Sequence, residues 1–139
     1  MIEKAVDAQM TIMNAMGQAV AVGTPNGPLV DLYVDLLAEE AAETFKAHED
    51  GVKAMAEQGD MISPFIELID GFADCIVICI GGMLAAGVDP NRVMDEVMIK
   101  SNMSKIQGAQ IREDGKFLKG PHFVAPDIKS IVMENWGIV

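Results

Sequence analysis

Two groups of acidic residues in the middle of the chain recur at helical spacing. They are Glu39, Glu40 and Glu43, which form Glu-Glu-x-x-Glu, and Glu67, Asp70 and Asp74. At about 100° of rotation per helical residue, Glu39 and Glu43 lie about 40° apart, and the second group falls within an arc of about 60°. Each group therefore shares one face of the helix that carries it.

Carboxylates this close together need a compensating positive charge, because like charges repel and bare charges in a core are costly. The segment from Ser63 to Ala86 is apolar on nearly every side and contains no Lys or Arg, which predicts that its acids are largely buried or beside a cavity. Mg²⁺ prefers oxygen ligands, and two facing acidic helices can hold two or more such ions. A di-iron site would want Glu-x-x-His pairs, which neither His48 nor His122 supplies. The acids predict a site for Mg²⁺, with Mn²⁺ possible; the alternative is two solvated acidic faces.

Apolar periodicity predicts the helices that would position these acids. Helices are expected at about residues 2–20, 29–48 and 63–86, and from 90 onward. A shorter and weaker helical piece is expected between Gly51 and Gly59. Ser63 is a candidate N-cap, and Asp89 followed by Pro90 is expected to start the next helix. The turn residues from Gly23 to Pro28 separate the first two helices.

The character of the chain changes after Lys105. Residues 110–112 and 116–118 flank Glu-Asp-Gly, which predicts a small hairpin, and Asp127 could cap a last helix ending near Trp136. We therefore expect an all-α fold in one domain, residues 1–139. It would have a four- to five-helix core at about 1–105 and a C-terminal hairpin and loop arm at about 106–139.

Composition limits the possible partners. The net charge of −11 disfavours nucleic acid and anionic membranes. The uncharged apolar stretch Cys75–Val88 has 14 residues, fewer than the roughly 20 of a membrane span. Cys75 and Cys79 are expected to be reduced core thiols in a cytoplasmic protein. Half the residues are hydrophobic, which predicts a homodimer or homotetramer that buries part of this surface.

The motifs also resemble a known family. Glu-Glu-x-x-Glu followed by a second acidic helix is similar to the MazG-type all-α nucleotide pyrophosphatase superfamily. The segment Ser-Asn-Met-Ser-Lys at 101–105 and the tail sequence Arg-Glu-Asp-Gly-Lys-Phe-Leu-Lys-Gly-Pro at 112–121 resemble its phosphoribosyl-ATP pyrophosphohydrolase-like branch, which includes phage-encoded members. The second motif of the superfamily is usually Glu-x-x-Asp, and aligning its Asp on Asp74 places Gly71 where Glu is expected. Asn14 also stands where similar proteins often have His.

The charge of each candidate residue suggests its role. The metal ligands would be Glu40, Glu43, Asp70 and Asp74, with Glu67 as a further candidate. Glu39 would orient or deprotonate the attacking water. Asn102 would hydrogen-bond the sugar or base, and the phosphates would be met by Lys105, Lys116 and Lys119.

Three functions are compatible with the sequence. The first is Mg²⁺-dependent hydrolysis of a (deoxy)nucleoside triphosphate, or a related nucleotide, to the monophosphate and pyrophosphate. The second is a catalytically silent bundle that binds metal or nucleotide in a regulatory role, which the departures at Asn14 and Gly71 keep open. The third is a structural dimerisation module. The paired acids together with Asn102 and Lys105 favour the enzyme.

Overall fold

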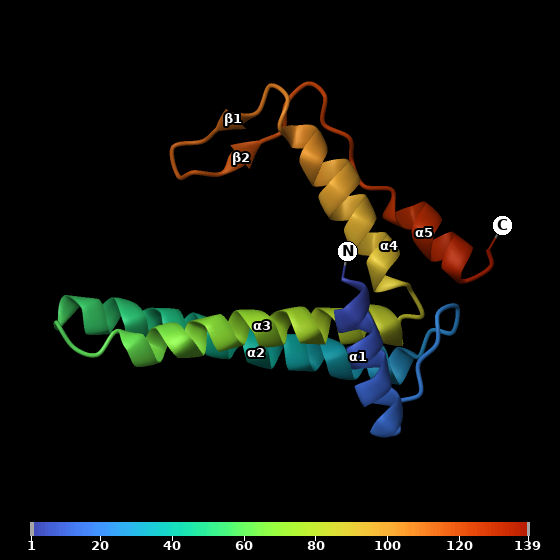
Figure 1. The fold of residues 1–139 in the computed structure, drawn as a ribbon, viewed down its shortest axis with the longest axis horizontal. Coiled ribbons are helices and arrows are strands. Elements are labelled where there is room, and N and C mark those ends of the chain that lie inside the picture. Colours follow the sequence, from blue (N-terminus) through green and yellow to red (C-terminus); the bar gives the residue numbers. More distant parts are fainter. Residues whose placement is uncertain (1, 139) are drawn as a thin grey trace.

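The computed structural model describes residues 2–138 and is mostly helical (Figure 1). The helices are α1 (Glu3–Ala15), α2 (Gly27–Ala56), α3 (Ile62–Ala85), α4 (Pro90–Met94), the π-helix η1 (Asp95–Asn102), the 3₁₀ turn η2 (Met103–Lys105) and α5 (Ile128–Asn135). The one sheet of the described chain pairs β1 (Gln110–Ile111) with β2 (Phe117–Leu118) in antiparallel register. The expectation of an all-α fold with a short C-terminal hairpin is confirmed in this form.

α2 and α3 form a long antiparallel hairpin, and glycines on α3 allow the two helices to approach closely (Figure 1). A Cβ atom on Gly71 would lie 2.3 Å from Thr44 Oγ1, and one on Gly81 would lie 2.1 Å from the Tyr33 ring. Any larger side chain at these positions would push the helices apart. Gly71 and Gly81 therefore set the register of α3 on α2.

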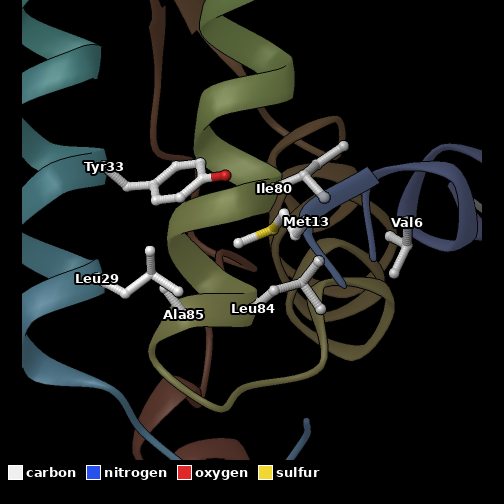
Figure 2. Packing of buried hydrophobic residues seen from close by; sticks show 7 residues of the cluster. All are labelled: Val6, Met13, Leu29, Tyr33, Ile80, Leu84 and Ala85. Carbon is white, nitrogen blue, oxygen red and sulfur yellow. The ribbon is translucent and has the colours of Figure 1, made fainter. Parts of the chain in front are cut away.

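The core lies at one end of this hairpin, where α1 crosses α3 (Figure 2). Its buried residues are Val6, Met13, Leu29, Tyr33, Ile80, Leu84 and Ala85. The Tyr33 hydroxyl donates to Gln18 Oε1 at 2.9 Å and lies 3.5 Å from Gln9 Nε2. Burial raises the pKa of Tyr33, which keeps this hydroxyl protonated as a donor.

Several predicted helix boundaries were wrong. The first helix ends at Ala15, and Gly17 follows with φ +80°. α2 continues through Gly51 to Ala56, because it packs against α3 along its length and this packing outweighs the low helix propensity of glycine. At the start of α3 the N-cap position is Met61, not the predicted Ser63, and Asp60 Oδ1 just before it accepts from the Ile62 amide at 2.9 Å.

The chain after α3 leaves the hairpin and then returns. Asp89 caps α4 as predicted, and α4, η1 and η2 form an extended arm with β1 and β2 at its far end (Figure 1). Asp127 caps α5 as predicted. α5 then packs near the start of this arm, where the Trp136 indole donates to the Ala86 carbonyl at 2.9 Å and Asn135 Oδ1 accepts from the Asp89 amide at 2.7 Å.

The two long edges of the α2–α3 hairpin differ in chemistry. Two residues that are two positions apart in a helix point in directions about 160° apart around its axis. This separates Phe72 from Asp74 on α3, and Phe45 from Glu43 on α2. The apolar edge carries exposed side chains from both helices, namely Phe45, Val52, Phe65, Ile69, Phe72 and Ile76. The exposed fractions of Phe45 and Phe65 are 68% and 60%.

The apolar edge continues into an open groove of about 430 Å³ lined by residues of α2 and α3, including Leu37, Ile78 and Cys79. Cys79 is exposed and Cys75 is partly buried, so the prediction that both are core thiols was wrong for Cys79. No other element of the described chain covers the side of α3 that carries Cys79. Among the described residues, α3 is also the one helix long and apolar enough to cross a membrane, judged by length and composition alone.

Candidate functional site

The packing of Thr44 fixes which acids of α2 and α3 face each other. Thr44 is buried, its hydroxyl donates to the Glu40 carbonyl at 2.7 Å, and its Oγ1 lies 3.9 Å from Cys75 Sγ. Thr44 contacts Gly71, and the two helices run in opposite directions. The residue one turn before Thr44 on α2 therefore lies opposite the residue one turn after Gly71 on α3. This places Glu40 opposite Asp74.

The charges of both acidic groups act on Glu40. Its pKa is raised above the ordinary value of 4.5, first by desolvation and then by the negative charges of Asp74, Glu43, Glu39 and Asp70. The tertiary structure therefore places five of the six acids on one edge of the α2–α3 hairpin, within electrostatic range of Glu40. We call these five residues the acidic edge.

Glu67 lies one turn away from the acidic edge, towards the N-terminus of α3, and is exposed. Gly71, which stands where a Glu was expected from the resemblance, points at Thr44 with no space for a side chain. A carboxylate at position 71 could not be accommodated without separating the helices. The absence of Glu at this position follows from the close packing of α2 and α3.

The acids are less buried than predicted. Glu40 and Asp74 are partly buried, whereas Glu39, Glu43 and Asp70 are exposed. The prediction assumed that the apolar surface of α3 is covered on every side, and one chain leaves much of it open. Among residues 2–138, no group of three or more Asp, Glu, His or Cys side chains lies close enough to hold a metal ion in this geometry. The oxygen donors suit Mg²⁺ in kind, but their side chains would have to converge further around an ion.

The raised pKa of Glu40 gives a prediction that needs no substrate. Since the folded chain holds the Glu40 proton more tightly than the unfolded chain, the free energy of unfolding falls as pH rises from 4.5 through the folded-state pKa. Above that pH the destabilisation is complete and remains at neutral pH. We expect Asp74→Asn to lower the pKa of Glu40, measured by NMR titration of the side-chain carboxyl.

Asp31→Asn is the matched control for this titration, because Asp31 is an exposed acid of α2 that is not among the charges acting on Glu40. The Glu40 pKa should be the same in Asp31→Asn and the wild type. An unchanged pKa in Asp74→Asn would show that the two acidic groups do not meet in solution.

Two of the predicted substrate-binding residues, Asn102 and Lys105, line a pocket at the far end of the arm. This arm pocket has a volume of about 450 Å³ and is lined by Asn102, Lys105, Ile106, Ala109 and Phe117. Lys105 Nζ donates to Asn102 Oδ1 at 2.7 Å across one turn. Asn102 ends the π-helix η1, and π-helical segments occur frequently at functional sites.

Lys119 does not line the arm pocket, but it shares a contact with the Phe123 ring with Lys105. Its Nζ lies 4.6 Å from the centroid of the Phe123 ring, and Lys105 Nζ lies 5.7 Å from the same centroid. Lys116 is placed differently, since its backbone closes the β1–β2 hairpin by accepting from the Arg112 amide at 2.8 Å. The structure thus groups Asn102, Lys105 and Lys119, while Lys116 sits at the hairpin turn.

The acidic edge and the arm pocket are separate in one chain. Figure 1 shows η2, β1 and β2 standing apart from α2 and α3. The sequence reasoning missed Phe117 and Phe123 of the arm. The sequence Gly-Pro-His-Phe at 120–123 was the available signal, because an aromatic residue beside a glycine turn and near lysines suits stacking against a ring.

Neither models of known protein families nor curated proteins match the chain. The class that the described residues define is an all-α protein with a helical hairpin, acidic along one edge, and a basic-aromatic pocket on a separate arm.

Proposed function

We propose that the protein is a Mg²⁺-dependent nucleotide pyrophosphatase that cleaves a (deoxy)nucleoside triphosphate, or a related nucleotide, to the monophosphate and pyrophosphate. The observation that carries the proposal is the placement of Glu39, Glu40, Glu43, Asp70 and Asp74 along one edge of the packed helices α2 and α3, where their negative charges act on Glu40. Such a concentration of carboxylates is unfavourable without a cation. A divalent ion supplies the charge that would also hold a triphosphate.

The resemblance of the acidic and tail motifs to the MazG-type superfamily supports the same function. In this proposal Glu40, Glu43, Asp70 and Asp74 would hold Mg²⁺, which would supply positive charge to neutralise and polarise the phosphates. Glu39, which is exposed beside these ligands, accepts a proton from water or orients it. Lys105 and Lys119 bind phosphate or the adjacent part of the nucleotide.

A panel of nucleoside triphosphates incubated with Mg²⁺ tests the proposal. Release of pyrophosphate and of the monophosphate, absent when the metal is chelated, is the expected result. Release of orthophosphate would mean that a different bond is broken. If the protein binds nucleotide or metal but forms no product, it is the silent regulatory bundle instead. This second candidate is favoured by the spacing of the acids, which in the described chain do not converge closely enough to hold a metal ion.

The assembly proposed with this function is a homodimer or homotetramer formed through the apolar edge of the α2–α3 hairpin. Phe45, Phe65 and Phe72 are each more than half exposed in one chain, and large exposed apolar patches mark interaction surfaces. A membrane would have to accept Asp70 and Asp74 within α3, which is costly. Because the acids lie on the opposite edge, assembly through the apolar edge leaves them open to a ligand.

We expect the mass in solution to be at least twice the monomer mass of 14.9 kDa, measured by multi-angle light scattering at micromolar concentration. Phe72→Glu should reduce the mass to that of the monomer, because it places a charge within the buried contact. Ile12→Glu makes the same change at an exposed residue of α1 and should leave the assembly intact. A wild-type protein that is monomeric would rule out this assembly.

A further inference from the structure

The arm pocket has the composition of a small-molecule site. Its volume of about 450 Å³ falls in the range of ligand pockets, roughly 300–1,000 Å³. Ile106, Ala109 and Phe117 supply an apolar lining, while Asn102 and Lys105 supply the polar groups. A small number of polar groups that point into an apolar pocket is typical of sites that bind and orient a ligand.

The lysines at this site have no carboxylate partner. Other basic residues near the arm are neutralised, since Lys100 pairs with Glu96 at 2.9 Å and Arg112 pairs with Asp114. Within residues 2–138, neither Lys105 nor Lys119 forms such a pair. Two unpaired cations close together in a chain of net charge −11 are complementary to an anion.

The site is held in place by backbone contacts from the tail. The Val124 amide donates to Ser104 Oγ at 2.8 Å, and Ser104 Oγ donates to the Ser101 carbonyl at 2.6 Å. A Cβ on Gly120 would lie 2.7 Å from the Gln107 carbonyl, so this glycine lets the tail pack directly against the end of η2. These contacts position Phe123 next to both lysines without a ligand, which lowers the entropy lost on binding.

We propose that the arm pocket binds the nucleoside monophosphate unit of a nucleotide without metal, and that Phe117 and Phe123 are specificity and positioning residues for it. Phe117, with Ile106 and Ala109, packs against the planar base. Asn102 hydrogen-bonds an edge of the base or sugar, and Lys105 and Lys119 bind the phosphate. Phe123 holds the two lysines by cation–π contacts. The choice of a nucleotide rests on the proposed function, but binding here does not require hydrolysis.

Isothermal titration calorimetry in the presence of a metal chelator and at low salt tests the inference on the full chain. The probes are a nucleoside monophosphate, the matching nucleoside and ribose 5-phosphate. We expect the monophosphate to bind more tightly than either fragment, because only it contacts both the apolar lining and the lysines. Phe117→Ala should lower the affinity for the monophosphate by about tenfold, since stacking on the base is lost. It should leave the affinity for ribose 5-phosphate unchanged. Lys119→Ala should lower the affinity for both the monophosphate and ribose 5-phosphate by about tenfold, since a charged hydrogen bond is lost.

Two further variants separate recognition from altered folding. Phe117→Tyr retains the ring and should retain the affinity for the monophosphate. Lys129→Ala removes an exposed lysine of α5, outside the pocket, and should bind like the wild type. If the monophosphate does not bind, or if Phe117→Ala and Lys119→Ala bind it as the wild type does, the inference is wrong.

The outcome is distinguishable from that of the proposed function. Metal-free monophosphate binding without pyrophosphate release from any triphosphate would contradict the enzyme and leave the arm pocket established. Pyrophosphate release from a triphosphate, together with no monophosphate binding in the chelator titration, would support the enzyme and contradict the arm pocket.

Discussion

Asp74→Asn and Glu43→Gln are each expected to abolish Mg²⁺-dependent turnover while the fold survives. Both residues belong to the carboxylates that raise the pKa of Glu40, and each would supply a ligand oxygen to the ion. Removing one ligand should lower kcat by roughly a hundredfold or more, because weakened metal binding affects every later step. The measurement is pyrophosphate release at saturating Mg²⁺.

The same variants carry an expectation for stability. Each removes one negative charge from a group of like charges, so the melting temperature without metal should rise at neutral pH. Added Mg²⁺ should raise the melting temperature of the wild type more than that of either variant, since ligand binding to the folded state stabilises it.

Asp31→Asn and Glu57→Gln are the matched controls, because they make the same chemical changes at exposed positions of α2 or its end. Both should keep wild-type rates. If Asp74→Asn and Glu43→Gln also kept them, the acidic edge would not be the metal site, and the solvated acidic face considered from the sequence would be the better description.

Lys105→Ala is expected to reduce kcat/KM by roughly tenfold to a hundredfold, the effect of losing one charged hydrogen bond. Lys105 is the most firmly placed of the three candidate lysines, because Asn102 accepts from it at 2.7 Å and the Phe123 ring lies 5.7 Å away. Steady-state kinetics at fixed Mg²⁺ measure the change. Lys105→Arg keeps the charge and should recover part of the rate.

Lys53→Ala provides the comparison, since Lys53 is an exposed lysine near the end of α2. It should leave kcat/KM unchanged. Wild-type kinetics in Lys105→Ala would place the phosphate ligands elsewhere and separate the arm pocket from catalysis.

Local patterns in the sequence were sufficient for most of the helical elements. The apolar periodicity predicted α2, α3 and the start of α4, and the Asp89-Pro90 and Asp127 caps depend only on neighbouring residues. The hairpin at β1 and β2 was also predicted, because a Gly-containing turn between short β-prone segments is a local signal. The extension of α2 past Gly51 was missed, since it depends on packing against α3.

The sequence alone determined that two groups of acids would each share a helix face, because that follows from the helical period. Only the tertiary structure decided that they meet, since the register of α2 on α3 is set by Gly71 against Thr44 and Gly81 against Tyr33. It also decided that Phe123 lies near both Lys105 and Lys119, because a hydrogen bond from Val124 to Ser104 joins segments 20 residues apart. Helical spacing fixes directions within one element, whereas contacts between elements depend on packing that no single segment specifies.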